Sequence, residues 1–289
     1  GLETVMKKKI IILTIVIAVL FPTAWSMFGP GRIWTKSMAD AIADNDLKKV
    51  EELAKDNTYI NTPGGVIFPL NLLPEWNNET PLEFAISCGN YKAVKILTDN
   101  GAVPVNDRVN MVGLVASSGT YSDEMFDTIT LLLKNGAKPD GTPEDANVNS
   151  ALLEIALLDC NKGSEREKLE KKILVMYKFV EKYCTNKAPI HPADRNSALS
   201  YACYRGNYRL VKYLLDKKRY YVNLRDEEGH TPLASVFLFN EDEQNLSKDN
   251  IVPLVKLLLK HGANKNIADS EGNTPVDYAK RIGMGQALQ

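Results

Sequence analysis

The sequence predicts an all-α solenoid, in which helix pairs stack so that each pair is one layer. Two observations predict it: one short motif recurs in a constant frame, and each copy is followed by a second apolar run. The composition agrees with a globular chain, because 44% of the 289 residues are apolar and the formal net charge is −1. These values argue against disorder, and a nearly neutral chain without a domain-wide basic stripe is not expected to bind nucleic acid.

The first helix of each predicted repeat begins at a Thr-Pro-Leu motif. Clear copies are Thr80-Pro81-Leu82, Thr231-Pro232-Leu233 and Thr274-Pro275-Val276. A threonine hydroxyl can cap the free N–H groups at a helix start, and proline suits the first helical position. A glycine such as Gly89 or Gly206 follows, and it ends the first helix because glycine tolerates positive φ.

A second helix is predicted after each of these glycines. Val94 and Leu97, and Val211 and Leu214, stand three residues apart, as the helical period requires. The second run then closes with Asn-Gly-Ala or a similar sequence, as at residues 135–137. One such helix pair cannot bury its apolar side alone, whereas stacked neighbours can.

The buried position of the motif defines seven repeats. The positions are Met38, Leu82, Val112, Leu153, Leu199, Leu233 and Val276. This pattern resembles the ankyrin repeat over residues 38–288, although the family period is about 33 residues and most spacings here are longer. The resemblance implies about six to seven helix-pair repeats joined by β-turn fingers, with insertions between them. It also implies that the concave face and the fingers contact a partner protein.

The N-terminal residues carry the features of a signal peptide. Lysines at residues 7–9 precede an apolar run of 12 residues at 10–21, and Ala24 and Ser26 match a cleavage site. The run is short for a membrane-spanning helix, which needs about 20 apolar residues. An uncleaved membrane anchor and a buried core helix remain as alternatives.

These features predict three segments. We expect a signal peptide at residues 1–26, with Met6 as the start of translation, a short linker at 27–36 and the repeat domain at 37–289. Whether the signal is cleaved or retained, the residues that follow it face outward, because the lysine-rich end stays in the cytoplasm. The protein is therefore expected to be exported, to the periplasm or beyond the cell.

The sequence holds no recognisable catalytic chemistry. It contains no HExxH, GxSxG or phosphate-binding motif, and its four cysteines form no CxxC pair. His191, His230 and His261 lie at repeat connections or helix ends and are interpreted as structural. We expect no enzymatic activity, no cofactor and no metal, and four free thiols because the cysteines fall in different layers and at opposite edges.

An apolar insertion at residues 63–76 is the first candidate for partner contact. Its side chains Phe68, Leu72 and Trp76 are too apolar for an ordinary surface loop, and exposed apolar clusters mark interfaces. The alternative is that the insertion folds back and caps the first repeat. Other insertions are expected as loops between first and second helices: residues 120–126, 161–168 and 239–250.

Charged and aromatic residues supply the other candidates. Glu83, Glu154 and Asp277 follow the buried motif position, which faces the concave groove in the family. They are interpreted either as solvated charges or as a surface that recognises a basic partner. The fifth repeat adds residue types that are favoured at interface centres: Tyr201, Tyr204, Arg205 and Tyr208.

Together these observations predict an exported, monomeric module that binds another protein. Its function is interpreted as that of an inhibitor or immunity-type binder of a toxin or enzyme. The alternative is a membrane-anchored structural adaptor at the cell envelope, which would contact the membrane only through an uncleaved N-terminal segment.

Overall fold

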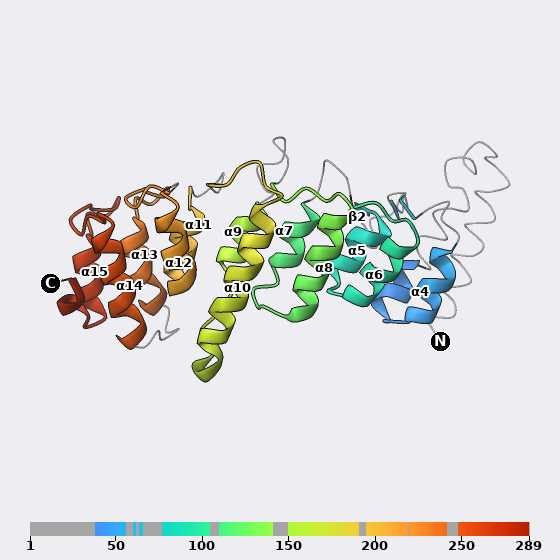
Figure 1. Cartoon of the computed structure of the whole chain (residues 1–289), viewed down its shortest axis with the longest axis horizontal. Helices are drawn as coiled ribbons and strands as arrows, with labels where there is room; N and C mark the ends of the chain where they lie inside the picture. The colour runs from blue at the N-terminus through green and yellow to red at the C-terminus, as the bar shows by residue number, and fades with distance from the viewer. Residues whose placement is uncertain are drawn as a thin grey trace, which may run out of the picture. The chain divides into compact units, whose positions relative to one another are not determined.

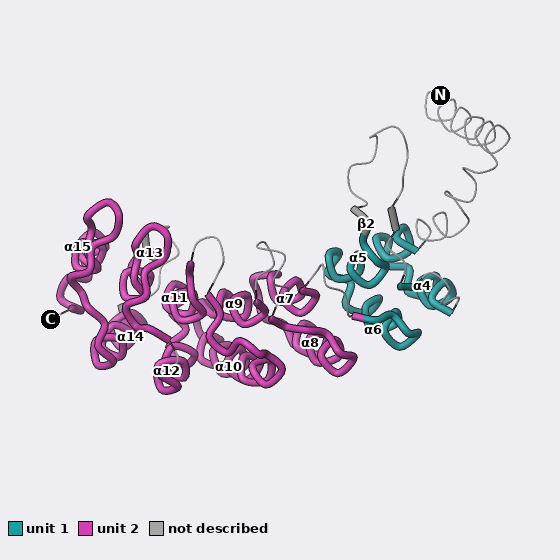
Figure 2. The backbone as a smooth tube through the Cα atoms, turned by 90° about the horizontal axis from the view of Figure 1, so that it is seen from above, with its two compact units in different colours: residues 1–103 teal, residues 104–289 magenta. Residues whose placement is uncertain are grey.

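The computed structural model describes residues 38–55, 60–61, 64–65, 77–104, 110–140, 150–190, 195–218, 220–241 and 248–288. The chain divides into two compact units, residues 1–103 and residues 104–289 (Figure 2). The expected signal peptide and linker, and the candidate residues Phe68, Leu72 and Trp76, lie outside the described residues. Among the described residues, no helix combines the length and the apolar character needed to cross a membrane.

Unit 1 is built from helices and one short pair of strands. A helical stretch at residues 38–43 precedes the labelled helices α4 (Leu47–Ala54), α5 (Pro81–Ser87) and α6 (Tyr91–Asp99) (Figure 1). The strands β1 (Gly64–Gly65) and β2 (Asn77–Glu79) pair antiparallel, with Gly64 opposite Glu79, and β2 leads directly into α5. The strand pair therefore takes the place of a finger before the first helix of a repeat.

Unit 2 consists of two helical layers, which Figure 2 shows as two rows. The first helices are α7 (Met111–Ala116), α9 (Ala151–Ala156), α11 (Ala198–Tyr204), α13 (Pro232–Glu241) and α15 (Pro275–Arg281). The second helices are α8 (Asp123–Lys134), α10 (Arg166–Glu181), α12 (Tyr208–Asp216) and α14 (Lys248–Lys260). Two short 3-10 helices, η2 (Gly163–Glu165) and η3 (Gly285–Leu288), complete it. The alternation confirms the predicted helix-pair fold.

The helix boundaries follow from local chemistry. Thr80 caps α5 with its hydroxyl, and Pro81 occupies the first helical position. Gly89 and Gly206 end the first helices of their repeats with φ of +65° and +66°. Each is followed by an asparagine that caps the second helix: Asn90 Oδ1 accepts the Ala93 N–H at 3.1 Å, and Asn207 caps α12 in the same way. This asparagine is a helix start that the motif analysis missed.

The predicted repeat frame matches the buried core. Met38, Leu82, Val112, Leu153, Leu199 and Leu233 are buried, whereas Val276 is half-buried. The motif leucine is the second residue after the N-cap. Since Ser150 caps α9, this position belongs to Leu152 and not to Leu153, and both leucines are buried. The frame is therefore confirmed, with a shift of one residue in the fourth repeat.

The insertions at residues 120–126, 161–168 and 239–250 were expected as loops, and the structure corrects this in part. Residues 120–122 and 161–162 are not helical and residues 163–165 form a 3-10 helix, whereas residues 123–126, 166–168, 239–241 and 248–250 belong to α-helices. Residues 242–247 lie outside the described residues. The second helices that follow them are long, with 12, 16 and 13 residues in α8, α10 and α14, compared with nine in α6 and α12. α8 begins at Asp123, α10 begins at Arg166, and α13 extends to Glu241. The inserted residues that join α10 are Arg166, Glu167 and Lys168, which are strong helix formers.

The four cysteines are free thiols in the structure. Cys88 is exposed, whereas Cys160, Cys184 and Cys203 are buried, and burial raises the pKa of the Cys160 thiol to about 12. Burial also raises the pKa values of the Cys184 and Cys203 thiols. Since the thiolate is the reactive form, two effects make these three thiols unreactive: reagents cannot reach them, and their raised pKa values keep them protonated.

We predict that a thiol-specific dye labels one cysteine in the native protein and four in denaturant under non-reducing conditions. Cys88→Ser should abolish the native labelling and lower the denatured count to three. A denatured count of two for the wild-type protein would show a disulfide and contradict the placement of the fourth repeat.

Candidate functional site

Glu83 was expected to display its charge in a groove, and the structure shows this to be wrong. Its side chain is 1% exposed, and its carboxylate accepts the backbone N–H of Thr80 while the Thr80 hydroxyl accepts the N–H of Glu83. Asp277 caps α15 in the same way, with Oδ2 at 2.9 Å from the Thr274 nitrogen. An acid three residues after a capping threonine reaches back to the helix start, so these carboxylates serve the fold. Glu154, one position further into its helix, is half-buried.

The candidate residues of the fifth repeat are divided between the two layers. Tyr201 and Tyr204 lie on α11, and Arg205 follows them with its guanidinium carbon 5.7 Å from the centre of the Tyr204 ring. Tyr208 instead begins α12 and lines a groove that α10 and α14 also border. The structure therefore brings three of these residues together in the first-helix layer and places the fourth in the second-helix layer.

A hollow between the finger loops of unit 2 was not found from the sequence. It has a volume of about 650 Å³, and its lining includes Arg195, Tyr221, Leu224, Arg225 and Glu227. Tyr221 is 77% exposed, the largest exposed fraction among the large apolar and aromatic side chains that the structure describes as exposed. Arg195 has φ of +60°, which is uncommon for a residue other than glycine.

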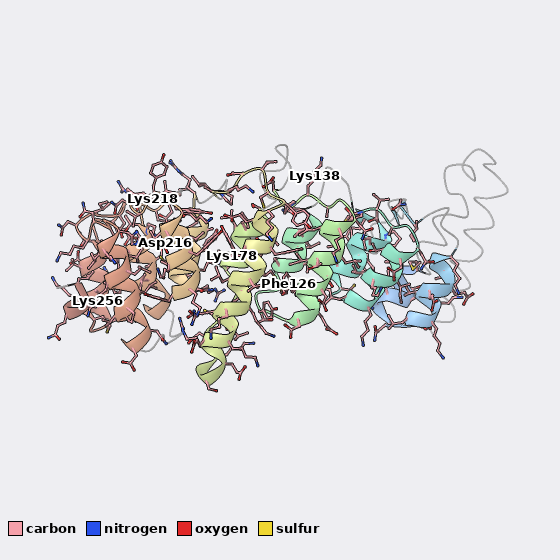
Figure 3. All side chains as sticks on the ribbon, in the orientation of Figure 1. Phe126, Lys138, Lys178, Asp216, Lys218 and Lys256 are labelled. Carbon is pink, nitrogen blue, oxygen red and sulfur yellow. The ribbon has the colours of Figure 1, made fainter. Side chains whose placement is uncertain are left out.

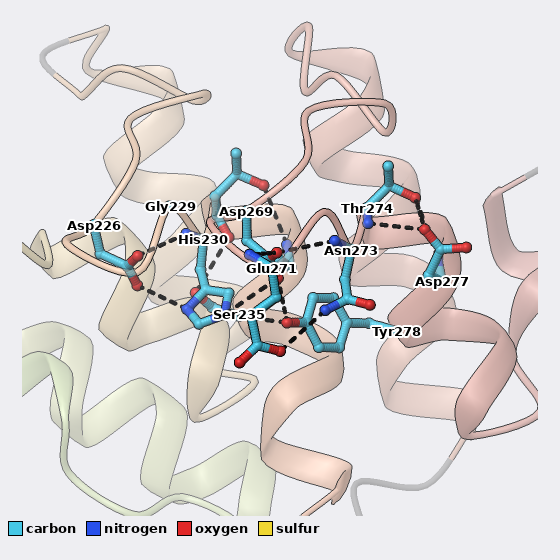
Figure 4. A network of polar contacts seen from close by, with 12 residues as sticks. Asp226, Gly229, His230, Ser235, Asp269, Glu271, Asn273, Thr274, Asp277 and Tyr278 are labelled. Atoms are coloured by element: carbon cyan, nitrogen blue, oxygen red, sulfur yellow. Dashed lines mark hydrogen bonds and ion pairs between the residues drawn. The ribbon is translucent and has the colours of Figure 1, made fainter.

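A polar network fixes the loops that border this hollow (Figure 4). His230 is its centre: Nδ1 lies 3.2 Å from Asp226 Oδ2, and Nε2 lies 3.2 Å from the Tyr278 hydroxyl. The Tyr278 hydroxyl also donates to Asp269, whose carboxylate is 3.7 Å from His230 Nε2. The hydrogen bond to Asp226 raises the pKa of His230, and the charges of Asp226, Asp269 and Glu228 add to the effect.

The network depends on a close turn at Gly229. Its φ is +88°, and a Cβ at this position would lie 2.5 Å from Arg225 Nη2 and 3.0 Å from the Cα of Asp269. The same Asp-x-x-Gly pattern recurs at Asp269, where Gly272 has φ of +86°. This repeated pattern is the sequence signal that could have revealed the finger turns. The contacts of His230 agree with its structural interpretation, and Asp226, Glu228 and His230 also bring three potential metal-ligand atoms within 4.8 Å of one another. His191 lies outside the described residues.

The fold and the finger surface define a class, a helical repeat protein with β-turn fingers. The family model described as "Ankyrin repeats (many copies)" matches residues 185–234. YahD of Escherichia coli (strain K12), a protein named for its ankyrin repeats, is 33% identical over 91 residues, or 32% of this chain and 43% of that protein. The match therefore spans less than half of the length of this relative.

A solved structure agrees with the family match. The human ASB11 ankyrin repeat domain aligns with 87% of this chain and 95% of its own, at 19% identity and a TM-score of 0.58. At this identity the comparison supports the fold alone. Together with the family match over residues 185–234 and the confirmed repeat frame, it shows that the chain has the ankyrin-repeat fold and resembles ankyrin-repeat proteins in sequence.

The raised pKa of His230 predicts how stability depends on pH. Protonated His230 is favoured in the folded state, so its contribution is complete below its unfolded pKa of about 6.5 and is lost as the pH rises through the higher folded pKa. We expect the unfolding free energy, measured with urea, to fall across this interval. Asp226→Asn should reduce the fall and lower the His230 pKa measured by NMR.

His230→Gln is the control, because it removes the titrating group and identifies its NMR signal. The assignment would be wrong if Asp226→Asn left both the His230 pKa and the pH dependence of stability at their wild-type values.

Proposed function

We propose that this ankyrin-repeat protein binds a partner protein through the finger surface of unit 2. Ankyrin repeats are protein-interaction modules and are typically non-catalytic, which agrees with the absence of catalytic motifs from the sequence. The proposal places the partner over the hollow formed by the finger loops, next to the first helices. It rests chiefly on one observation, the exposure of Tyr221 at the rim of that hollow.

The chemistry of the hollow supports recognition of a protein. Tyrosine and arginine are enriched among the residues that contribute most to interfaces, and Tyr221, Arg195 and Arg225 line the same hollow. The bonds of His230 and the Arg225 Nε–Gly229 O hydrogen bond, at 3.2 Å, hold its walls before a partner arrives. Such pre-organisation reduces the entropy that binding costs. The positive φ of Arg195 is a local strain of the kind found at functional sites.

We predict that Tyr221→Ala combined with Arg195→Gly reduces partner binding at least about tenfold. Glycine is chosen at residue 195 because it accepts the φ of +60° without strain. The measurement is affinity capture from native extract by the immobilised protein, with quantitative mass spectrometry of the captured proteins. The matched control is Glu124→Ala with Lys134→Ala, two exposed positions on α8 of the same unit.

Thermal melting should be nearly the same for both double variants, since exposed side chains contribute little to stability. A captured protein that is retained equally by the finger variant and the control would place the binding surface elsewhere.

We further propose that the protein acts after export, in the role of an inhibitor or immunity-type binder. The support is the sequence of residues 7–26, in which lysines, an apolar run and a small-residue site follow one another. N-terminal sequencing of the protein purified from its native cells should give Met27 as the first residue. A first residue at Met6 would contradict cleavage and would favour the membrane-anchored adaptor.

A further inference from the structure

The second-helix layer of unit 2 contains a groove on a different side from the fingers. α12 has nine residues and lies between α10, with 16, and α14, with 13. The groove has a volume of about 610 Å³ and is lined by residues from all three helices. Its apolar lining comes from Leu174, Tyr208, Tyr213 and Pro253. The inserted residues that lengthen α10 and α14 therefore also make the walls of this groove.

Two acidic residues at one end of the groove, Glu167 and Glu170, are bound within the protein, whereas Asp249, which also lines the groove, is exposed. Glu170, with a side chain 7% exposed, pairs with Arg166 at 3.0 Å and accepts the backbone N–H of Arg209 at 3.3 Å. Glu167 accepts a hydrogen bond from the Arg209 side chain at 2.6 Å and also pairs with Lys171 at 3.1 Å. These carboxylates neutralise the neighbouring cations, so this end of the groove has little net charge.

At the other end of the groove, where Lys178 lines it, lie the C-terminal ends of the three helices, and their exposed lysines are here called the lysine face. One of these lysines, Lys256, also lines a separate hollow with Met284 and Gln286. Each of the three helices contributes two exposed lysines near its C-terminal end. They are Lys178 and Lys182 on or after α10, Lys217 and Lys218 after α12, and Lys256 and Lys260 on α14. Figure 3 labels Lys178 on α10, Lys218 after the end of α12 and Lys256 on α14, and it also labels Asp216, the last residue of α12.

Few acidic groups oppose these lysines. Along the C-terminal halves of α10, α12 and α14, the described acidic residues are Asp216 and Glu181. Asp216 pairs with Lys212 at 3.1 Å, and Glu181 is buried and accepts the Tyr213 hydroxyl at 2.6 Å. The lysine face is therefore strongly positive on a chain whose overall charge is −1.

Tyr213 joins the groove to the lysine face. It lines the groove, and the ammonium groups of Lys178 and Lys217 lie 4.7 and 5.3 Å from the centre of its ring. Lysines at helix C-termini complement the helix dipole, which explains Lys182, Lys217, Lys218 and Lys260. The same effect applies to Lys178, which lies in the last turn of α10, but it does not explain Lys256, which stands about one turn before the end of α14.

We propose that the groove and the lysine face form a second binding surface, which takes an acidic polypeptide segment with aromatic or aliphatic side chains. The acidic groups of the segment would pair with the lysines, and its apolar side chains would enter the groove beside Tyr208 and Tyr213. A polypeptide fits better than a lipid bilayer, because a flat bilayer surface cannot follow a groove between helices. Since this surface lies in the second-helix layer, it is independent of the finger surface.

The test uses the full chain and a fluorescein-labelled peptide of glutamates interrupted by tyrosines. Binding is measured by fluorescence anisotropy, and the same peptide with glutamine in place of glutamate is the charge control. The variant Lys178→Glu/Lys217→Glu/Lys256→Glu changes one lysine on each helix. The control variant Lys48→Glu/Lys92→Glu/Lys134→Glu changes the net charge equally at exposed lysines elsewhere.

We expect the lysine-face variant to lose at least about tenfold in affinity, or about 1.4 kcal/mol, while the control stays within about twofold of wild type. Binding should weaken with added salt, and the glutamine peptide should bind poorly. Tyr208→Ala should weaken binding of the tyrosine-containing peptide but not of a peptide of glutamate alone. Tyr221→Ala, in the finger surface, should leave both unchanged.

Other results would overturn the proposal. Equal losses in the two triple variants would show that only overall charge matters, and no binding by the wild-type protein would show that the lysines are simply solvated. Binding to phosphatidylserine vesicles that Tyr208→Ala does not affect, without binding of the peptide, would identify a membrane-facing surface. Circular dichroism and melting temperature establish that each variant is folded.

Discussion

A single helix pair of this fold cannot bury its apolar side, so every pair needs a neighbour on which to stack. In unit 2 the second helix α12 presents Leu210, Val211 and Leu214, and all three are fully buried by neighbouring elements. Full burial of each large apolar side chain contributes about 1.5–3 kcal/mol, so an uncovered pair would be unstable. Each pair must therefore begin and end at a fixed place relative to the next, which the threonine caps and the positive-φ glycines ensure.

This constraint explains which parts of the fold could be predicted. The cap at Thr80, the proline at Pro81 and the glycine at Gly206 act within a few residues of sequence, so their patterns indicate helix boundaries without any knowledge of the tertiary structure. The buried frame was predictable for the same reason, since Leu199 and Leu233 stand at fixed distances from local signals. Only in the fourth repeat, where Ser150 replaces the threonine, did the expected position shift by one residue.

The functional surfaces were harder to predict because their residues come from different repeats. The lysines of the lysine face are separated by more than 30 residues from one helix to the next, so no local pattern indicates a basic patch. The resemblance to the family placed the Glu83 carboxylate in the concave groove. In the structure the carboxylate instead accepts the backbone N–H of Thr80 and caps its own helix. The hollow beside Tyr221 depends on how three loops lie against one another, which no local pattern reports.

Stacking also explains how one fold can carry two surfaces of different chemistry. The core uses the inward sides of both layers, so the fingers and the outward sides of the second helices can vary without uncovering buried leucines. In the fingers, Asp226 and Asp269 accept hydrogen bonds within the turns. On the lysine face, Lys178 and Lys217 instead lie against the ring of Tyr213. The stacked fold requires particular residues only at the capping and buried positions. The residues at the surface positions can therefore differ according to the partner.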